Sequence, residues 1–262
     1  MIEALRPLMR PHRLIMIAIA IAIVWWCAVS LNWSWLPDYW NNGLIQQGLW
    51  TTTWMLVVSW AIGLFLAIWL GLAQAAGPWY LALPAKGFCS VIRGTPLLLQ
   101  MWFLYYGLGS LFPYIPWIRH SWAWTYLRDA WPFGLLSLTL SFAGYEGEVM
   151  RGALKSVPHG QLEAARAYGM PRFTILRRIW LPQAVRLVLP TLGGETVLQL
   201  KSTPLVATIT VIDLFDVSRR VYQDTFITYE PLLLLALVYL GYTGVIVLLF
   251  RLVERSVPNR VA

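Results

Sequence analysis

Residues 54–73 read WMLVVSWAIGLFLAIWLGLA, a stretch of the chain without a single charged side chain. About 18 or more apolar residues are enough for one helix to cross the hydrocarbon core of a bilayer. The rest of the chain agrees, because 58% of its 262 residues are hydrophobic and only 12% are charged. An ordinary soluble domain has about twice that charged fraction. The sequence therefore predicts an integral membrane protein.

Further apolar runs accompany this one, so we expect an all-α membrane protein with about six transmembrane helices in a single domain, residues 1–262. The expected spans are residues 14–31, 52–73, 95–113, 130–148, 189–212 and 231–250. The first run could instead be a cleaved signal peptide, which would leave five spans. Its length and the lack of a clear cleavage site argue against that alternative. Residues 41–50, mixed polar and apolar, are expected to form a separate short helix on the outer surface.

The basic residues orient these spans. Fifteen of the twenty lysines and arginines lie in the N-terminal segment, the second and fourth loops and the C-terminal tail, and four lie in the alternate loops. Lys86 and Arg93 are assigned in this way to the second loop. Positively charged loops remain in the cytoplasm, so both termini are expected on the cytoplasmic side.

The fourth loop, residues 152–186, has a distinctive pattern. Pro158 and Gly160 indicate a turn, and residues 161–168 (QLEAARAY) are good helix formers. Gly169 is expected to cap this helix, and a basic segment, residues 172–180, follows and is expected to end at Leu181–Pro182. A helix of two turns is not stable alone in water, so it must dock against something. An ordinary surface loop whose arginines meet anionic lipid headgroups is the alternative.

This loop resembles the EAA signature of the membrane subunits of bacterial ATP-binding-cassette importers. The matching residues are Glu163-Ala164-Ala165, Gly169 and Ile179-x-Leu181-Pro182. The wider segments 147–152, 156–161, 92–97 and 200–205 resemble the polar amino acid branch of that family. Within the branch, the chain is most similar to permeases for histidine, lysine, arginine, ornithine or opines, over roughly residues 44–255.

The resemblance implies a coupling helix that binds the ATP-hydrolysing subunit. The implied coupling residues are Gly160, Glu163, Ala164, Ala165 and Gly169, with both alanines expected on the helix surface. The chain has no Gly-x4-Gly-Lys-Ser/Thr phosphate loop, so no cofactor is expected in it, and ATP and Mg would be bound by the partner subunits. The implied partners are two ATPase subunits, a second related or identical permease, a periplasmic solute-binding protein and membrane lipid, with no nucleic acid. The implied location is the bacterial inner membrane.

Two ionisable residues, Glu195 and Lys201, lie inside the fifth expected span, where charged groups are costly and usually functional. Glu195, Gln199 and Ser202 follow i, i+4, i+7 spacing and share one face of a helix. We interpret this face as a path for a cationic substrate; the alternative is that Glu195 only packs against a neighbouring span. Lys201 and Pro204 are assigned structural or gating roles, since proline loosens a helix.

Glu148 and Arg151 close the fourth expected span. Their i, i+3 spacing predicts a simple ion pair on a helix, and a role in gating or in anchoring the loop is the alternative. Glu146 also lies at this end of the span.

Two other classes of protein compete with the importer interpretation. A self-contained secondary transporter would typically have paired interrupted spans, and the sequence indicates only one. A membrane enzyme is not supported, because His12, His120 and His159 are scattered without metal-ligand spacing. The sequence therefore predicts no metal site and no catalytic residue, and favours an importer permease for basic amino acids or opines.

Overall fold

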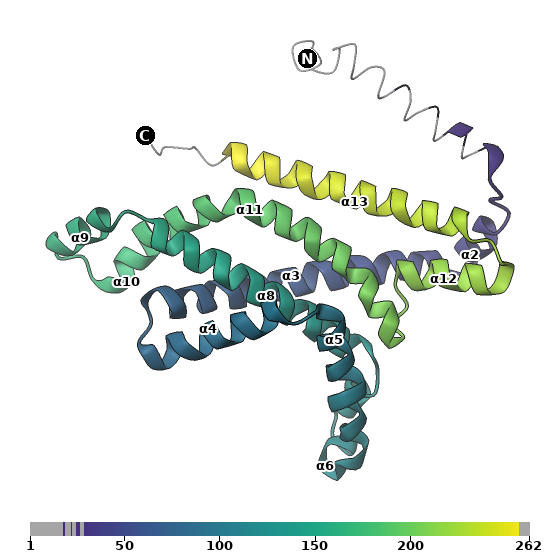
Figure 1. The fold of residues 1–262 in the computed structure, drawn as a ribbon, viewed down its shortest axis with the longest axis horizontal. Coiled ribbons are helices and arrows are strands. Elements are labelled where there is room, and N and C mark those ends of the chain that lie inside the picture. The colour runs from purple at the N-terminus through teal and green to yellow at the C-terminus, as the bar shows by residue number, and fades with distance from the viewer. Residues whose placement is uncertain (1–17, 19–21, 23–24, 27–28, 257–262) are drawn as a thin grey trace.

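The computed structural model describes residues 18, 22, 25–26 and 29–256. Every regular element among these residues is a helix. Figure 1 shows an elongated molecule whose long helices follow its long axis. Most of the expected first span, residues 14–31, lies outside the described residues.

Helix α3 (Leu44–Ala76) contains the apolar stretch that opens the sequence argument. Its 33 residues correspond to about 50 Å at about 1.5 Å per residue, longer than the hydrocarbon core of about 30 Å. The expected separate surface helix at residues 41–50 is wrong, because α3 begins at Leu44 and runs through this segment without a break. The short separate helix is α2 (Leu36–Asn41), and Gly43, with φ of 83°, makes the turn between the two.

The exposed side chains of α3 mark a membrane-spanning portion. Trp50 and Trp69 are exposed, and the large exposed side chains between them are Val57, Ile62 and Phe65. Tryptophan collects at both membrane interfaces. The 19 residue steps between the two tryptophans correspond to about 28 Å, which matches the thickness of the hydrocarbon core.

Helix α4 (Trp79–Gly94) follows α3 after the turn at Gly77 and Pro78 and packs against α3 and α8 (Trp131–Ser156). The assignment of Lys86 and Arg93 to a loop is therefore wrong, since both residues lie within α4. Ala85 and Cys89 are buried one turn apart, whereas Lys86 and Arg93 are exposed. Lys86 lies off the buried side, whereas Arg93 follows Cys89 by four residues on the same side and reaches the Tyr145 ring of α8.

The segment after α4 departs from regular helix. α5 (Leu97–Trp102) continues into a π-helix, η1 (Phe103–Gly109), and these elements point away from the bundle (Figure 1). Shorter elements complete the connection to α8: η2 (Phe112–Tyr114), α6 (Pro116–Arg119) and α7 (Trp124–Leu127).

Helices α3 and α8 form the most extensive packing in the bundle. Gly71 lies directly against Met150: a Cβ at this glycine would be 2.7 Å from the Met150 side chain. Gly63 is also tight against Phe142. Small residues let helix backbones approach closely inside a membrane, where packing drives helix association.

The fourth loop joins the next long helix without a gap. α9 (His159–Ala167) and α10 (Arg172–Ile175) precede a π-helical turn, η3 (Leu176–Trp180), which continues directly into α11 (Leu181–Ser202). The expected helix end at Leu181–Pro182 is wrong. A proline has no N–H for the regular ladder, and the π-turn before Pro182 accommodates this without ending the helix.

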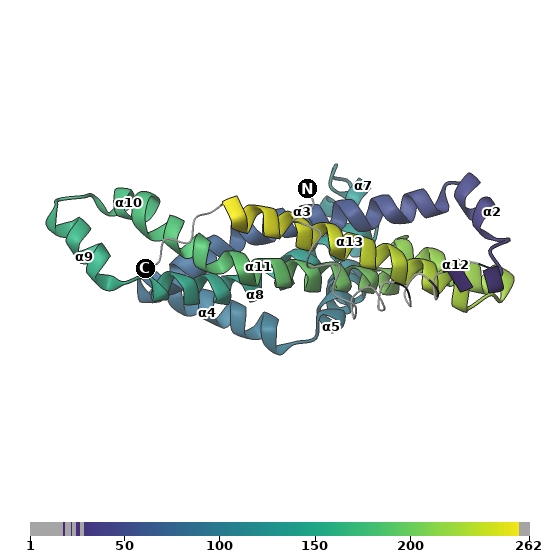
Figure 2. The ribbon, with the colours of Figure 1, turned by 90° about the horizontal axis from the view of Figure 1, so that it is seen from above.

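After α11 the chain bends. η4 (Thr203–Ile209) is a 3-10 helix, and α12 (Leu214–Thr225) follows with a bend of 49°. α13 (Tyr229–Ser256) then returns along α11 and α12. Figure 2 shows that α3, α8, α11 and α13 lie along one common axis.

Among the described residues, α3 and α13 are long and apolar enough to cross a membrane, and the bent segment from Arg172 to Thr225 makes a third candidate. The chain is therefore a helical protein with at least these membrane-spanning candidates.

Candidate functional site

A cavity of about 330 Å³ lies where three parts of the chain meet: the α4–α5 junction, the middle of α8 and the C-terminal half of α11. Its polar lining residues are Thr95, Ser141, Tyr145, Glu195, Gln199, Lys201 and Ser202. The structure thus brings together the predicted path residues and the segment at residues 92–97.

Glu195 and Lys201 line the same cavity. They form no ion pair with each other or with any other described residue. The cavity therefore offers one negative and one positive side chain to a ligand. A zwitterionic molecule can use both charges at once, because its ammonium and carboxylate groups need opposite partners.

Gln199 is only 5% exposed, and its side chain connects three helices. Its Nε2 donates to Ser59 Oγ of α3 at 3.0 Å and to the Leu138 carbonyl oxygen of α8 at 3.0 Å. The amide group is thus engaged in packing. Ser202 Oγ donates to the carbonyl oxygen of Leu198 in its own helix at 3.0 Å.

The junction at Thr95 and Pro96 forms one wall of the cavity. Gln100 fixes this junction: its Nε2 donates to the Ile92 carbonyl oxygen at 2.9 Å and to Thr95 Oγ1 at 2.8 Å. Gln100 and Thr95 were not among the predicted site residues. Pro96 is the sequence signal that could have found them, since a residue before proline avoids the helical region.

Three polar residues of α8 at or near the site were also missed: Ser141, Tyr145 and Glu146. Tyr145 lines the cavity, and the Arg93 guanidinium lies over its ring, 5.7 Å from the centroid. Glu146 is 1% exposed, neither of its carboxylate oxygens has a hydrogen-bond partner among the described residues, and it interacts electrostatically with Glu195. The sequence interpretation treated Glu146 only as the end of a span. Its burial follows from packing that no local pattern encodes.

Helix α9 contains the EAA residues and lies at one end of the elongated molecule (Figure 1). Gly169, with φ of 74°, terminates it. The Gly169 N–H donates to the Arg166 carbonyl oxygen at 2.9 Å, and the Met170 N–H donates to the Ala165 carbonyl oxygen at 3.1 Å. These two bonds define a Schellman cap, so Gly169 has the predicted capping geometry.

One side of α9 packs on the bundle. Leu162 and Ala165 are each 5% exposed and belong to a core cluster with Leu154 and Val188. The expectation that Ala165 lies on the helix surface is therefore wrong: because it follows Leu162 by three residues, it shares the buried side. The other predicted coupling residues, Gly160, Glu163, Ala164 and Gly169, are exposed.

Of the remaining predicted positions, Glu148 and Arg151 lie inside α8, which continues to Ser156 beyond the expected end of the span. Arg151 Nε donates to Glu148 Oε1 at 2.9 Å, so the i, i+3 ion pair forms. Pro204 stands at the start of η4, where the α-helix changes to 3-10 helix. No group of three or more His, Cys, Asp or Glu side chains within the described residues is arranged to hold a metal ion.

Comparison with curated proteins gives relatives over most of the chain. The octopine transport system permease protein OccM of Rhizobium radiobacter is 40% identical over 205 residues, which cover 78% of this chain and 82% of that protein. The histidine/lysine/arginine/ornithine transport system permease protein HisM of Escherichia coli K12 is 35% identical over 225 residues, covering 86% and 93%.

Solved structures have the same fold. An amino acid ABC transporter crystallised with histidines is 27% identical, with a TM-score of 0.71 over 87% of this chain and 100% of that one. An inward-facing MetNI methionine ABC transporter has a TM-score of 0.65 at 17% identity, over 85% of this chain and 99% of that one, which indicates a shared fold. Residues 63–259 match the family described as binding-protein-dependent transport system inner membrane component. The chain belongs to this family of transporter membrane subunits.

Proposed function

We propose that this chain is the permease subunit of an ATP-driven importer for a basic amino acid or an opine. The observation that carries this proposal is the cavity in which Glu195 and Lys201 face one ligand space without pairing. The relatives OccM and HisM, whose names give octopine and basic amino acids as substrates, support the same substrate class. The comparisons do not favour the secondary-transporter alternative.

The charges of the cavity suit this class of substrate. Lys201 would bind the α-carboxylate, and Glu195 would bind a cationic group of the substrate. The Ser141 hydroxyl lies in the same lining and would form a hydrogen bond with one of the remaining polar atoms.

The proposed topology keeps six spans at residues 14–31, 52–73, 95–113, 130–148, 189–212 and 231–250. Both termini and the coupling loop, residues 152–186, lie in the cytoplasm of a bacterial inner membrane. The distribution of lysine and arginine supports this orientation.

The proposed partners are a second permease, two ATPase subunits that bind ATP and Mg, and a periplasmic solute-binding protein. The exposed face of α9, with Gly160, Glu163 and Ala164, would bind one ATPase subunit, and Gly169 would fix the direction in which the chain leaves it. Rigid-body motion of the ATPases would pass through η3 into α11, because these elements are continuous, and would open the cavity to each side in turn. Glu148, Arg151 and Pro204 would hold or bend the helices that move.

The test is uptake into vesicles that contain the complete importer, with ATP inside and a series of arginine concentrations outside. We expect Glu195→Gln to raise the KM for arginine on the order of tenfold, because a charge-assisted hydrogen bond is lost. Glu254→Gln, an exposed glutamate outside the cavity, is the matched control and should leave the KM unchanged.

An unchanged KM in Glu195→Gln would contradict the proposed substrate path. Uptake that proceeds without ATP or without the ATPase subunits would instead support a secondary transporter.

A further inference from the structure

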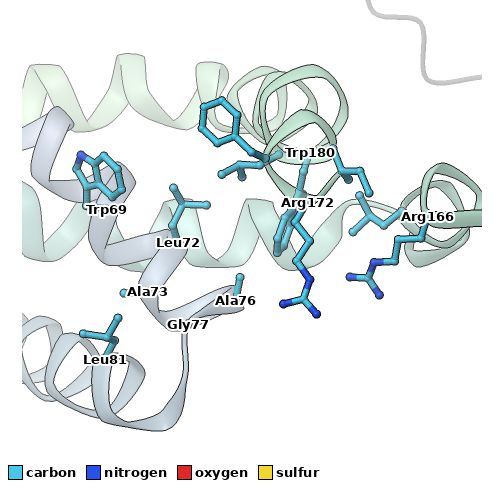
Figure 3. Close-up of a pocket in the computed structure, with 13 residues that line it drawn as sticks. Trp69, Leu72, Ala73, Ala76, Gly77, Leu81, Arg166, Arg172 and Trp180 are labelled. Atoms are coloured by element: carbon cyan, nitrogen blue, oxygen red, sulfur yellow. The ribbon is translucent and has the colours of Figure 1, made fainter. Parts of the chain in front are cut away.

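A second cavity, of about 700 Å³, lies apart from the cavity beside Glu195 (Figure 3). It is bounded by the C-terminal end of α3, the start of α4 and the segment from α9 to η3. It therefore joins the coupling segment to the bundle. The proposed transport reaction uses none of its lining residues.

The wall of this cavity is apolar. Trp69, Leu72, Leu81, Phe173 and Leu176 line it, and no acidic residue does. Phe173 is 71% exposed and Trp69 is 60% exposed. A trough of aromatic and aliphatic side chains suits a hydrocarbon chain, because burying apolar surface is favourable at roughly 25 cal/mol per Å².

One end of the cavity is basic. Figure 3 shows the side chains of Arg166 and Arg172 extending next to each other, at the end of the cavity away from Trp69. Neither arginine forms an ion pair with any described residue. Two unpaired guanidinium groups on one rim form a binding site for a phosphate group, which accepts hydrogen bonds from both.

The position of this cavity along the chain favours a lipid as its occupant. It lies where α3 ends and the chain turns into α4, next to exposed aromatic side chains at Trp69 and Trp79. Such aromatic residues mark the headgroup region. A soluble anion would satisfy the arginines but leave Trp69 and Phe173 uncovered, whereas a phospholipid would fill both parts.

We propose that this cavity binds an anionic phospholipid, with an acyl chain along Trp69, Leu72 and Phe173 and the phosphate against Arg166 and Arg172. This lipid would bridge α3 and the coupling segment. The inference rests on the membrane location of the chain and not on the identity of the transported substrate.

The test uses phosphatidylglycerol with a photoreactive acyl chain, added to nanodiscs of phosphatidylcholine that contain the full chain. We expect cross-links mapped by mass spectrometry to fall at the end of α3 and in α10 and η3. Arg166→Gln with Arg172→Gln should reduce this labelling on the order of tenfold, since each basic contact strengthens binding of anionic lipid. Ala76→Trp, which fills the trough from an exposed lining position, should reduce it as well.

The matched control is Arg177→Gln with Arg178→Gln, which removes two exposed arginines of the same segment that do not line the cavity. This pair should retain the labelling. Equal labelling by a phosphatidylcholine probe, or an equal loss in the control pair, would overturn the proposal. Unchanged labelling in Arg166→Gln/Arg172→Gln, together with lost co-purification of the ATPase subunit, would assign the arginines to that subunit instead. None of these measurements depends on uptake, so their failure leaves the proposed transport function standing.

Discussion

Helix α9 and the cavity beside Glu195 are built in opposite ways. α9 is nine consecutive residues with one side packed on the bundle and the other exposed. The cavity is assembled from Thr95, Ser141 and Glu195, which lie on three different parts of the chain. A contiguous element can be recognised from a short motif, whereas an assembled cavity depends on how helices pack. The comparison also separates two kinds of substitution. A substitution on the exposed side of α9 should weaken contact with a partner, whereas a substitution near the cavity should destabilise the chain itself.

The largest effect should come from Glu163→Lys on the exposed side of α9. A reversed charge at an interface places like charges together and costs several kcal/mol, so we expect ATP-driven uptake to fall on the order of hundredfold. The measurement is uptake together with co-purification of the ATPase subunit.

The thermal unfolding temperature of the Glu163→Lys chain should stay unchanged, because Glu163 makes no ion pair with any described residue. Glu254→Lys, a reversal at another exposed position, is the control and should retain uptake. Normal uptake in Glu163→Lys would show that the exposed side of α9 does not bind the ATPase.

Gln199→Leu should produce the next largest effect, on the fold itself. It removes two buried hydrogen bonds and leaves the Leu138 carbonyl oxygen and Ser59 Oγ without that donor. We expect a loss of about 2 kcal/mol of stability, measured as a lower unfolding temperature in detergent.

Ser202→Ala is the matched change on the same helical stripe. Its hydroxyl bonds only within α11, so the unfolding temperature should change little. Equal losses in Gln199→Leu and Ser202→Ala would contradict the view that Gln199 holds α3, α8 and α11 together.

The smallest effect should come from Gly169→Ala at the end of α9. Gly169 has φ of 74°, and a methyl group added there would meet no other atom within 4 Å, so the cost is conformational, about 1 kcal/mol. Gly160→Ala lies in the same helix, also without a steric neighbour and without a positive φ, and should be neutral or slightly stabilising. The unfolding temperatures of the two variants compare them directly, and equal values would argue against the left-handed cap.

The sequence was most informative where one segment carries the whole signal. The helical fold and family membership followed from the apolar runs and from the EAA residues. The cap at Gly169 and the Glu148–Arg151 pair depend on neighbours within a few residues, which spacing alone can reveal, whereas α9 begins at His159, two residues before the expected start. Such local features do not depend on how distant helices pack.

Positions that depend on packing were predicted less well. Hydropathy placed Lys86 and Arg93 in a loop because it registers their charge, but both fit in α4, since Lys86 is exposed and the Arg93 guanidinium lies over the Tyr145 ring of α8. Ala165 was expected on the helix surface, but it lies on the same side of α9 as Leu162, and that side packs on the bundle. No sequence pattern predicted the burial of Glu146, because this burial results from contacts between residues that are far apart in the chain.

The two exposed tryptophans of α3 make the protein sensitive to the membrane around it. Trp50 and Trp69 hold fixed positions about 28 Å apart on a rigid helix. In a thicker bilayer, the apolar surface between them would be too short, and the membrane would have to thin locally or the helix would stand more upright. In a thinner bilayer, α3 would tilt and carry the turn into α4 with it. Lipid chain length would then act mechanically on the end of the molecule where α9 lies.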